Sequence, residues 1–263
     1  MPKVAAIQFT PVFGQKQESL RRLAKLVIAA AKGGAQLIVA PEMAAVGYSF
    51  MSPADVAPLA ETLLPMPNDE QHPGTSAQIM GALASRLNVH IAWGMIERDA
   101  GTGNYYNTQV LICPDGNYES YRKVNLWGND LLWAHEGRAN PPVLTCDFGG
   151  VSKKVGLLIC RDVRDKKDDH WDSFYQKGDA DIVAFSANWG DGGFPANAWM
   201  DFVQSNDATL IVANRYGEEG DKPNKFGGGG SCIVSTDKTP EHPNGVYCDG
   251  LLWNQDCIVY ADV

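Results

Sequence analysis

Short apolar runs alternate with stretches of helical periodicity along most of the chain. Residues 18–32 carry apolar side chains at 20, 23, 26, 27 and 30, a spacing that places them on one face of a helix. Apolar runs of strand length flank this segment at 3–9 and 36–40, and two glycines after Lys32 end the helix. The pattern therefore predicts a strand, a helix and a second strand at the start of the sequence.

The same alternation continues through the rest of the chain. A helix is predicted over 73–88, where Ile79, Leu83 and Leu87 share one face. The pattern predicts further helices around 171–177 and at 196–207, and further strands at 90–96, 105–113, 118–121, 154–160, 181–186, 208–214, 231–235 and 257–262.

The sequence Pro-Asp-Gly-Asn at 114–117 separates two of these strands and is typical of a hairpin. Elsewhere helices connect successive strands. This mixture of hairpins and helical crossovers favours an α/β or α+β fold with mixed sheets rather than purely parallel ones.

Length and composition are typical of a folded globular protein. The chain has 263 residues, 44% of them hydrophobic and 20% charged, and nothing near its middle resembles a linker, so we expect one domain over 1–263. The net charge of −9 and the absence of a basic run argue against nucleic-acid binding. The longest apolar stretch, 26–31, is too short to cross a membrane, and the first residues lack signal-peptide features. We therefore expect a soluble, cytoplasmic protein.

The six cysteines give little sign of a metal site. They lie at 113, 146, 160, 232, 248 and 257, none forms a C-x-x-C motif, and no histidine stands at zinc spacing from them. Most occur in apolar runs, as reduced core cysteines do. The cysteine pattern therefore predicts no structural metal site.

Three residues that can do chemistry follow buried strands. Glu42 comes directly after the apolar run at 36–40, at the strand end where α/β sheets place their sites. Lys123 lies among aromatic residues, and Cys160 ends an apolar strand just before an abruptly polar stretch. Taken singly, each has an ordinary structural interpretation: a solvated glutamate, a surface lysine with a packed stem and a core cysteine.

Taken together and in order, these segments resemble the nitrilase superfamily of carbon–nitrogen hydrolases over essentially the whole chain. Glu42 and Lys123 are 81 residues apart and Cys160 follows 37 residues later, which fits that family. The matching segments are Val4-Ala-Ala-Ile-Gln, Gly34-Ala-Gln-Leu-Ile-Val-Ala-Pro-Glu-Met with Gly47-Tyr48, Tyr106-Asn-Thr, Tyr121-Arg-Lys, Cys160-Arg-Asp-Val-Arg and Ala213-Asn-Arg.

The resemblance implies a four-layer αββα sandwich that assembles into homodimers or larger homo-oligomers. It also implies a Glu-Lys-Cys triad formed by Glu42, Lys123 and Cys160. Glu42 would act as the general base that a protonated thiol needs, and Cys160 would attack a carbonyl or nitrile carbon. Lys123 and the backbone N–H of Arg161 would stabilise the oxyanion.

Members of this family commonly have a second acid, usually glutamate, between the lysine and the cysteine. Counting back from Gly137 in the family pattern reaches Asp130, which is one methylene shorter, whereas Glu136 directly precedes the glycine. We prefer Asp130 over Glu136 for this role. Asn125 stands where a histidine is common soon after the lysine.

Other residues are candidates for substrate contact. By resemblance, Tyr48, Asn188 and Trp189 would line the pocket, and the alternative for Tyr48 and Trp189 is that they are core side chains or oligomer contacts. Asn107 and Asp162 would support the site by hydrogen bonding.

Three arginines, at 138, 161 and 164, offer a cation to an acidic substrate tail, which makes an ω-amide acid attractive. The alternative is that Arg164 pairs with nearby acids such as Asp165 and packs the turn at the cysteine.

The sequence thus predicts a cofactor-free thiol amidohydrolase that acts on a small linear amide. A nitrilase or an N-carbamoyl amidohydrolase of the same family remains open, and the loops at 53–73 and 130–142 would decide between them. A thiol acyltransferase and a non-catalytic scaffold are the alternatives outside hydrolysis.

Overall fold

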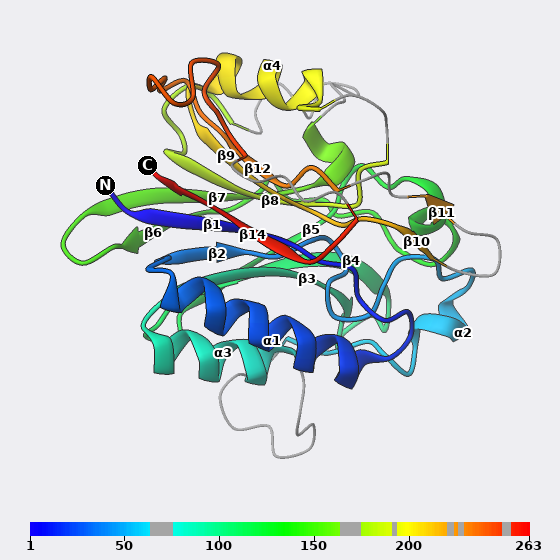
Figure 1. Cartoon of the computed structure of the whole chain (residues 1–263). Helices are drawn as coiled ribbons and strands as arrows, with labels where there is room; N and C mark the ends of the chain where they lie inside the picture. The colour runs from blue at the N-terminus through cyan, green and yellow to red at the C-terminus, as the bar shows by residue number, and fades with distance from the viewer. Residues whose placement is uncertain (64–75, 164–174, 191–193, 220–223, 226–228, 249–253) are drawn as a thin grey trace.

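Two six-stranded sheets lie face to face, and helices cover their outer faces (Figure 1). This is seen in a computed structural model that describes residues 1–63, 76–163, 175–190, 194–219, 224–225, 229–248 and 254–263. The four layers match the predicted αββα sandwich of mixed sheets.

The first sheet mixes parallel and antiparallel pairs. Its strands, in spatial order, are β14 (Cys257–Asp262), β1 (Lys3–Gln8), β2 (Leu37–Val39), β3 (His90–Arg98), β4 (Tyr105–Ile112) and β5 (Tyr118–Arg122). β1, β2 and β3 run parallel to one another, while β14, β4 and β5 are antiparallel to their neighbours.

The second sheet has a similar order with a parallel centre. Its strands are β13 (Val246–Tyr247), β12 (Cys232–Val234), β9 (Thr209–Asn214), β8 (Ile182–Ala187), β7 (Ser152–Ile159) and β6 (Val143–Asp147). β7, β8 and β9 are parallel, and antiparallel strands flank them. A two-stranded ribbon pairs β10 (Glu218–Glu219) with β11 (Asn224–Lys225).

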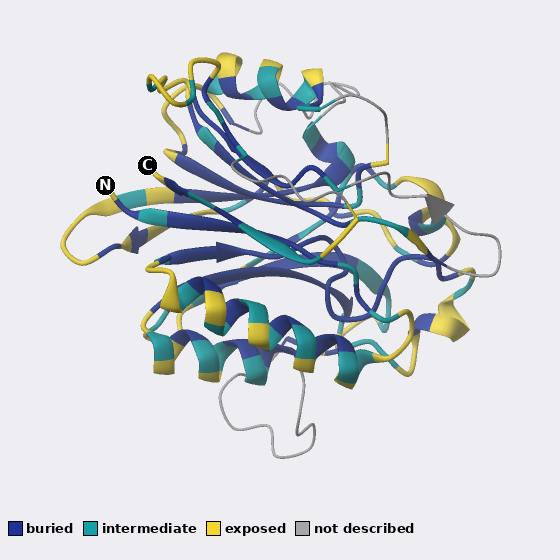
Figure 2. Ribbon diagram, in the orientation of Figure 1, coloured by how far each residue is buried: buried dark blue, intermediate teal, exposed yellow. Residues whose placement is uncertain are grey.

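The facing surfaces of the sheets form the main core, which Figure 2 shows as continuously buried strands. Gln109 crosses this core: its amide donates to Ala184 O and Ser186 Oγ, and its oxygen accepts from the Leu158 N–H. Because unpaired polar groups in such a core are costly, these bonds fix the two sheets relative to each other.

Helices α1 (Lys16–Lys32) and α3 (Ser76–Leu87) cover the outer face of the first sheet, and α4 (Asn197–Asn206) covers the second (Figure 1). The short helix α2 (Pro53–Val56) and the 3₁₀ turns η1 (Gly128–Leu132) and η2 (Cys160–Val163) lie in the connections. Leu20, Leu23, Val27 and Ala30 of α1 are buried, as their spacing predicts.

The predicted elements agree with the structure to within a few residues, with three differences. The buried apolar face of α3 consists of Ala77, Met80 and Ala84, and the predicted stripe of Ile79, Leu83 and Leu87 is only partly buried beside it. Five short elements were not predicted: the strands β6, β10, β11 and β13 and the helix α2. Of the helix expected around 171–177, residues 175–177 are not helical, and the remainder lies outside the described residues.

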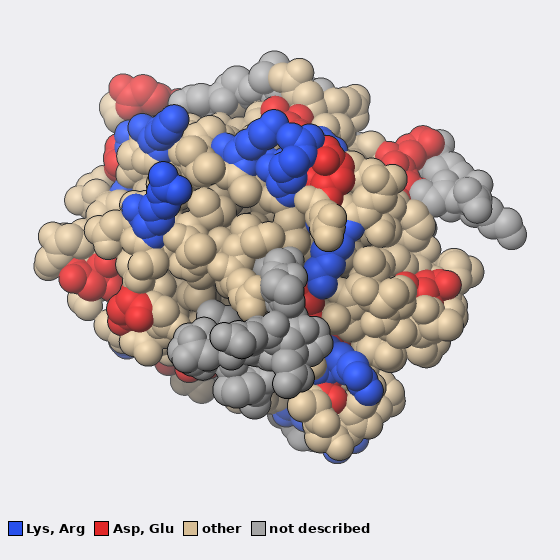
Figure 3. All heavy atoms as spheres, turned by 90° about the horizontal axis from the view of Figure 1, so that it is seen from below, with Lys and Arg blue, Asp and Glu red and all other residues tan. Residues whose placement is uncertain are grey.

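Surface charge is mixed on the face seen in Figure 3, where basic side chains form separate groups with acidic ones beside several of them. On α1, for example, Arg21 bonds Glu18 across one helical turn at 2.6 Å. Among the described residues, no helix is long and apolar enough to cross a membrane.

Candidate active site

Three strand ends bring the predicted residues together. Glu42 follows β2, Lys123 follows β5 and Cys160 follows β7. β2 and β7 belong to different sheets, so the residues meet where the two sheets face each other at one end of the sandwich.

Lys123 is the centre of a buried hydrogen-bond cluster. Its Nζ lies 2.7 Å from Glu42 Oε1 and 2.6 Å from Asp130 Oδ2. The amide of Asn107 donates to the same Glu42 oxygen at 2.7 Å and to Asp130 at 3.1 Å. The side chains of both ion pairs are fully buried, so protein groups replace the water that would otherwise solvate these charges.

The electrostatics of this cluster keep the lysine charged. Burial alone would lower the pKa of Lys123, but the carboxylates of Asp130 and Glu42 together raise it well above the ordinary value. Lys123 is therefore a cation with three N–H donors, two of which are used by the carboxylates. It cannot act as a base at neutral pH.

Cys160 adopts a constrained backbone conformation beside this cluster. It has a φ of 44°, in the left-handed region that is uncommon for residues other than glycine, and it begins the turn η2. Burial and the neighbouring carboxylate of Glu42 raise the pKa of its thiol above the ordinary value. The resting thiol is therefore protonated and needs a base to become a nucleophile.

Glu42 has one carboxylate oxygen left for that task. Oε1 accepts from Lys123 and Asn107, whereas Oε2 has no hydrogen-bond partner among the described residues. The backbone of Glu42 and Met43 packs directly against Gly94. A Cβ at position 94 would approach the Met43 nitrogen to 2.3 Å and the Glu42 Cα to 2.8 Å. Gly94 thus permits the close packing that positions the carboxylate.

Asp130 and Glu136 lie in different environments. Asp130 is fully buried at the second carboxylate position of the cluster, within η1, and burial raises its pKa. Glu136 is exposed. The structure thus brings Asp130 to Lys123 and leaves Glu136 at the surface, and the catalytic role of Asp130 stays a prediction.

Asp162 fastens the segment that follows Lys123. Its carboxylate accepts from the Tyr121 hydroxyl at 2.9 Å and from the Asn125 N–H at 2.8 Å. Burial raises the pKa of Asp162 to about 7. Asn107 and Asp162 therefore both hydrogen-bond to the site or its supports, as expected, and Tyr121 is a support that sequence reasoning did not assign.

Glu219 is a second support that the sequence did not reveal. Its carboxylate accepts from the N–H groups of Tyr48 and Ser49 and from the guanidinium of Arg215 at 2.8 Å. This holds Tyr48 with its ring 6.0 Å from Lys123 Nζ, and the Tyr48 hydroxyl donates to Trp127 O. The only signal in the sequence was Arg215, in the Ala213-Asn-Arg segment.

Asn188 and Trp189 follow β8 but differ in their contacts. The backbone N–H of Asn188 lies beside the Cys160 thiol, and its side-chain amide has no hydrogen-bond partner among the described residues. Trp189 is buried with its ring 5.6 Å from that of Trp199, and its backbone is held by Asn214. Trp189 therefore packs in the core of the second sheet, in line with the alternative interpretation of this residue.

Of the three arginines considered as anion anchors, Arg138 and Arg161 are described, and they lie in different surroundings. Arg161 stacks on Trp127, with its guanidinium carbon 3.9 Å from the ring centroid. Arg164 lies outside the described residues.

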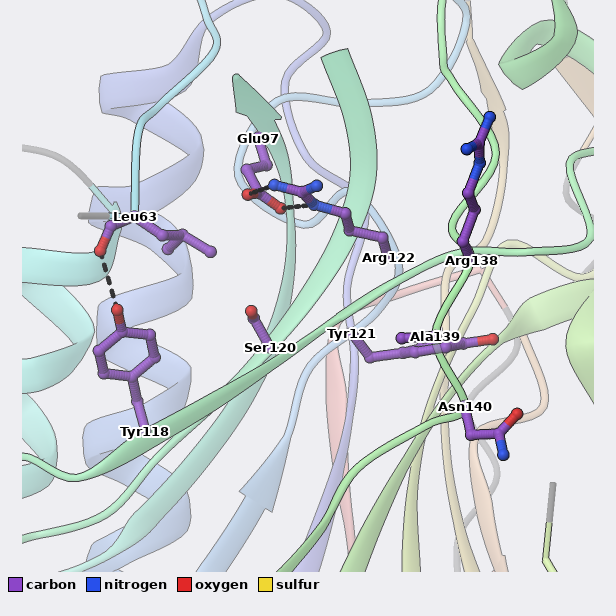
Figure 4. Close-up of a pocket in the computed structure, with 9 residues that line it drawn as sticks. All are labelled: Leu63, Glu97, Tyr118, Ser120, Tyr121, Arg122, Arg138, Ala139 and Asn140. Carbon is purple, nitrogen blue, oxygen red and sulfur yellow. Dashed lines mark hydrogen bonds and ion pairs between the residues drawn. The ribbon is translucent and has the colours of Figure 1, made fainter. Parts of the chain in front are cut away.

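Arg138 lines a pocket of about 420 Å³ beside β5, seen in Figure 4. Glu97, Tyr121 and Arg122 also line it, and Arg122 is already paired with Glu97 and Asp99. None of Glu42, Lys123 and Cys160 lines this pocket. A substrate carbon held there does not contact the Cys160 sulfur, so this pocket is not assigned to the reaction.

Comparisons with known proteins identify the family of this chain. The sequence model of the carbon–nitrogen hydrolase family matches residues 3–238. A nitrilase of Pyrococcus abyssi is 28% identical over 83% of this chain and 77% of its own length. An (R)-stereoselective amidase of Pseudomonas is 28% identical over 88% of this chain and 77% of its own.

Solved structures give the same fold. An amidase of Nesterenkonia superposes with a TM-score of 0.77 at 23% identity, covering 100% of this chain and 93% of that one. Another structure of that amidase carries a covalent acetamide adduct at its active-site cysteine, at 22% identity and a TM-score of 0.76, covering 100% of this chain and 90% of that one.

Proposed function

Because this chain belongs to the carbon–nitrogen hydrolase family, as an amidase-type hydrolase, we propose that it hydrolyses small linear amides through a thioester on Cys160. The observation that carries the proposal is the buried Lys123 held between Glu42 and Asp130, with a protonated thiol beside Glu42.

The first half-reaction forms the acyl-enzyme. Glu42 Oε2 takes the thiol proton as Cys160 Sγ attacks the carbonyl carbon, which gives a tetrahedral oxyanion. The third N–H of Lys123 and the Arg161 backbone N–H stabilise that charge. The C–N bond then breaks, Glu42 returns the proton to the leaving nitrogen, and ammonia departs.

The second half-reaction releases the acid. Glu42, again a carboxylate, takes a proton from water, which attacks the thioester carbon through a second oxyanion at the same donors. The C–S bond breaks, the proton returns to sulfur, and the net reaction is amide plus water to carboxylic acid plus ammonia.

Asp130 positions the lysine in this scheme. Two carboxylates on one ammonium fix the direction of its remaining N–H and keep it charged through both half-reactions. The shorter side chain of aspartate reaches Lys123 because η1 brings the backbone at 130 close to it.

The proposal that the substrate is an ω-amide acid is supported by fewer contacts than the proposed mechanism. Arg161 directly follows the nucleophile and stacks on Trp127, and we propose that it is the cation that binds the acid group of an ω-amide acid. An omega-amidase of Xenopus laevis, 28% identical over 62% of this chain and 55% of its own length, supports this choice.

Ammonia release from a panel of substrates tests the proposal. Simple aliphatic amides, ω-amide acids, N-carbamoyl compounds and nitriles are compared, with wild type and Cys160→Ala in parallel. We expect Cys160-dependent release, fastest from amides, and a raised KM for ω-amide acids in Arg161→Gln but not in Arg138→Gln. Release by Cys160→Ala at wild-type rates would contradict the mechanism, and turnover of nitriles alone would move the chain to nitrilase chemistry.

We also propose that the chain forms a homodimer or larger homo-oligomer. Met51, Trp127 and Leu131 expose more than half of their surface, and the Asn129 amide, within the same loop as Leu131, donates to Phe50 O beside Met51. Exposed apolar side chains beside the site are suited to an interface with a second copy of the chain. Light scattering measures the mass in solution, and a monomer at micromolar concentration would contradict this proposal.

A further inference from the structure

A second cluster of reactive side chains lies at the opposite end of the sheets from Cys160. His90 begins β3, Cys113 directly follows β4, and Cys146 lies in β6 of the other sheet. Cys113 is six positions along the chain from the active-site residue Asn107, a distance of about 20 Å in a strand. The proposed hydrolysis uses none of the three residues.

The three side chains converge on one buried point. A ring nitrogen of His90 and the sulfur atoms of Cys113 and Cys146 all lie within 4.8 Å of one another. The residues are only 4%, 6% and 1% exposed, and none of the cysteines is in a disulfide. His90 and Cys113 continue the β3–β4 pairing, in which Ile91 is opposite Ile112, so antiparallel register places them side by side.

The imidazole is oriented as in a metal site. Its Nε2 lies 3.0 Å from Asp147 O, and a carbonyl can only accept, so Nε2 carries the proton. Nδ1 is then left with its lone pair, and the ring interacts with the thiol of Cys113, a second member of the cluster. Metal-binding histidines commonly donate their other N–H to such a carbonyl, which fixes the ring and its tautomer. Phe148 packs on the ring at 4.9 Å and closes the site from another side.

We propose that His90, Cys113 and Cys146 bind one thiophilic d¹⁰ cation, Zn²⁺ or Cu⁺. Two thiolates and an imidazole are the soft donors that such cations prefer. Metal–sulfur and metal–nitrogen bonds of about 2.3 and 2.0 Å separate the donors by roughly 3.5–4 Å, so side-chain shifts of about 1 Å or less bring this cluster to bonding distance. Binding displaces the two thiol protons to solvent.

Such an ion would be structural. It would cross-link β3 and β4 of the first sheet to β6 of the second, far from the bond that is broken. Sequence spacing argued against a metal because the ligands are 23 and 33 positions apart and come from three strands, so no local motif could reveal them.

The test is an anaerobic titration of the reduced, full-length protein. Zn²⁺ is added in competition with a chromophoric zinc chelator, and Cu⁺ in competition with a Cu⁺-selective one, which distinguishes the two cations. Co²⁺ serves as a spectroscopic probe, since thiolate ligands give it a charge-transfer band. Cys146→Ser and His90→Gln change the site, while Cys257→Ser and Cys160→Ala are matched cysteine controls outside it.

We expect one ion per chain, a raised Tm with the ion bound, and at least tenfold weaker binding in both site variants with no change in the controls. His90→Gln retains both thiols, so it tests the ligand role if Cys146→Ser folds poorly. The proposal is overturned if the reduced wild type binds neither cation stoichiometrically, if His90→Gln binds as tightly as wild type, or if Cys113 and Cys146 form a disulfide under these reducing conditions.

Discussion

Replacing Lys123 with methionine removes the cation from a fully buried cluster of three charges. Methionine has nearly the same length and keeps the apolar stem in place. Glu42 and Asp130, each within 2.7 Å of the ammonium in the wild type, are then left as two buried carboxylates with no counter-ion at this position.

The magnitude follows from that loss. Removing one partner of a buried ion pair costs about 3–5 kcal/mol, because the remaining charge stays desolvated. For a domain of this size each kcal/mol lowers Tm by about 2–4 °C, so Tm should fall by about 6–20 °C. The matched control is Lys177→Met, since Lys177 is 73% exposed and pairs with Asp207 at 3.2 Å. An exposed pair of this kind is worth at most about 1 kcal/mol.

The loss should also depend on pH. Burial raises the folded-state pKa of Asp130 above its unfolded value, and without the cation nothing opposes that shift, so ionisation of Asp130 opposes folding. The penalty is absent below the unfolded pKa of about 4 and grows as pH rises through the raised folded value. Thermal unfolding of wild type, Lys123→Met and Lys177→Met at pH 5 and pH 8 measures this. A Tm of Lys123→Met equal to that of Lys177→Met at pH 8 would refute the buried cluster.

Three further predictions concern the supports of the site. Asp130→Asn removes a charge-assisted bond to Lys123 and should lower kcat about 10- to 100-fold, measured by ammonia release; an unchanged kcat would remove Asp130 from the mechanism. Ionisation of Asp162, whose pKa burial raises to about 7, opposes folding as pH rises from about 4 through 7, so Asp162→Asn should flatten the pH dependence of Tm over that range; a profile parallel to wild type would contradict this. Gly94→Ala should cost about 1–3 kcal/mol and most of the activity, because its Cβ would meet the backbone after β2; Gly101→Ala, where the nearest atom is 3.5 Å away, should change neither, and equal effects would show that close packing at 94 is unimportant.

The sequence predicted those features that depend on neighbours along the chain. Strands, helices and the 114–117 hairpin follow from local periodicity and turn chemistry, and the Asp115 carboxylate indeed accepts from the Asn117 N–H. The meeting of Glu42, Lys123 and Cys160 was anticipated through the family resemblance, since single strand-end residues carry no information on which ends share a site.

Features that depend on packing between distant segments could not be predicted from the sequence. Glu219 supports Tyr48 from 171 positions away, and His90 meets Cys146 across the sandwich, so neither leaves a pattern within one segment. The buried face of α3 was predicted wrongly because bulky residues were taken to mark it, whereas Ala77, Met80 and Ala84 are the buried apolar residues of this helix.

Covalent chemistry at Cys160 is the central step of the proposed mechanism. Acid quenching of the wild-type enzyme during turnover of its fastest amide, followed by mass spectrometry of the intact protein and its peptides, measures that directly. We predict an adduct whose mass equals the amide minus ammonia, located on the peptide that contains Cys160 and missing from Cys160→Ala. An adduct on another residue, or hydrolysis by Cys160→Ala at the wild-type rate, would contradict the proposed mechanism.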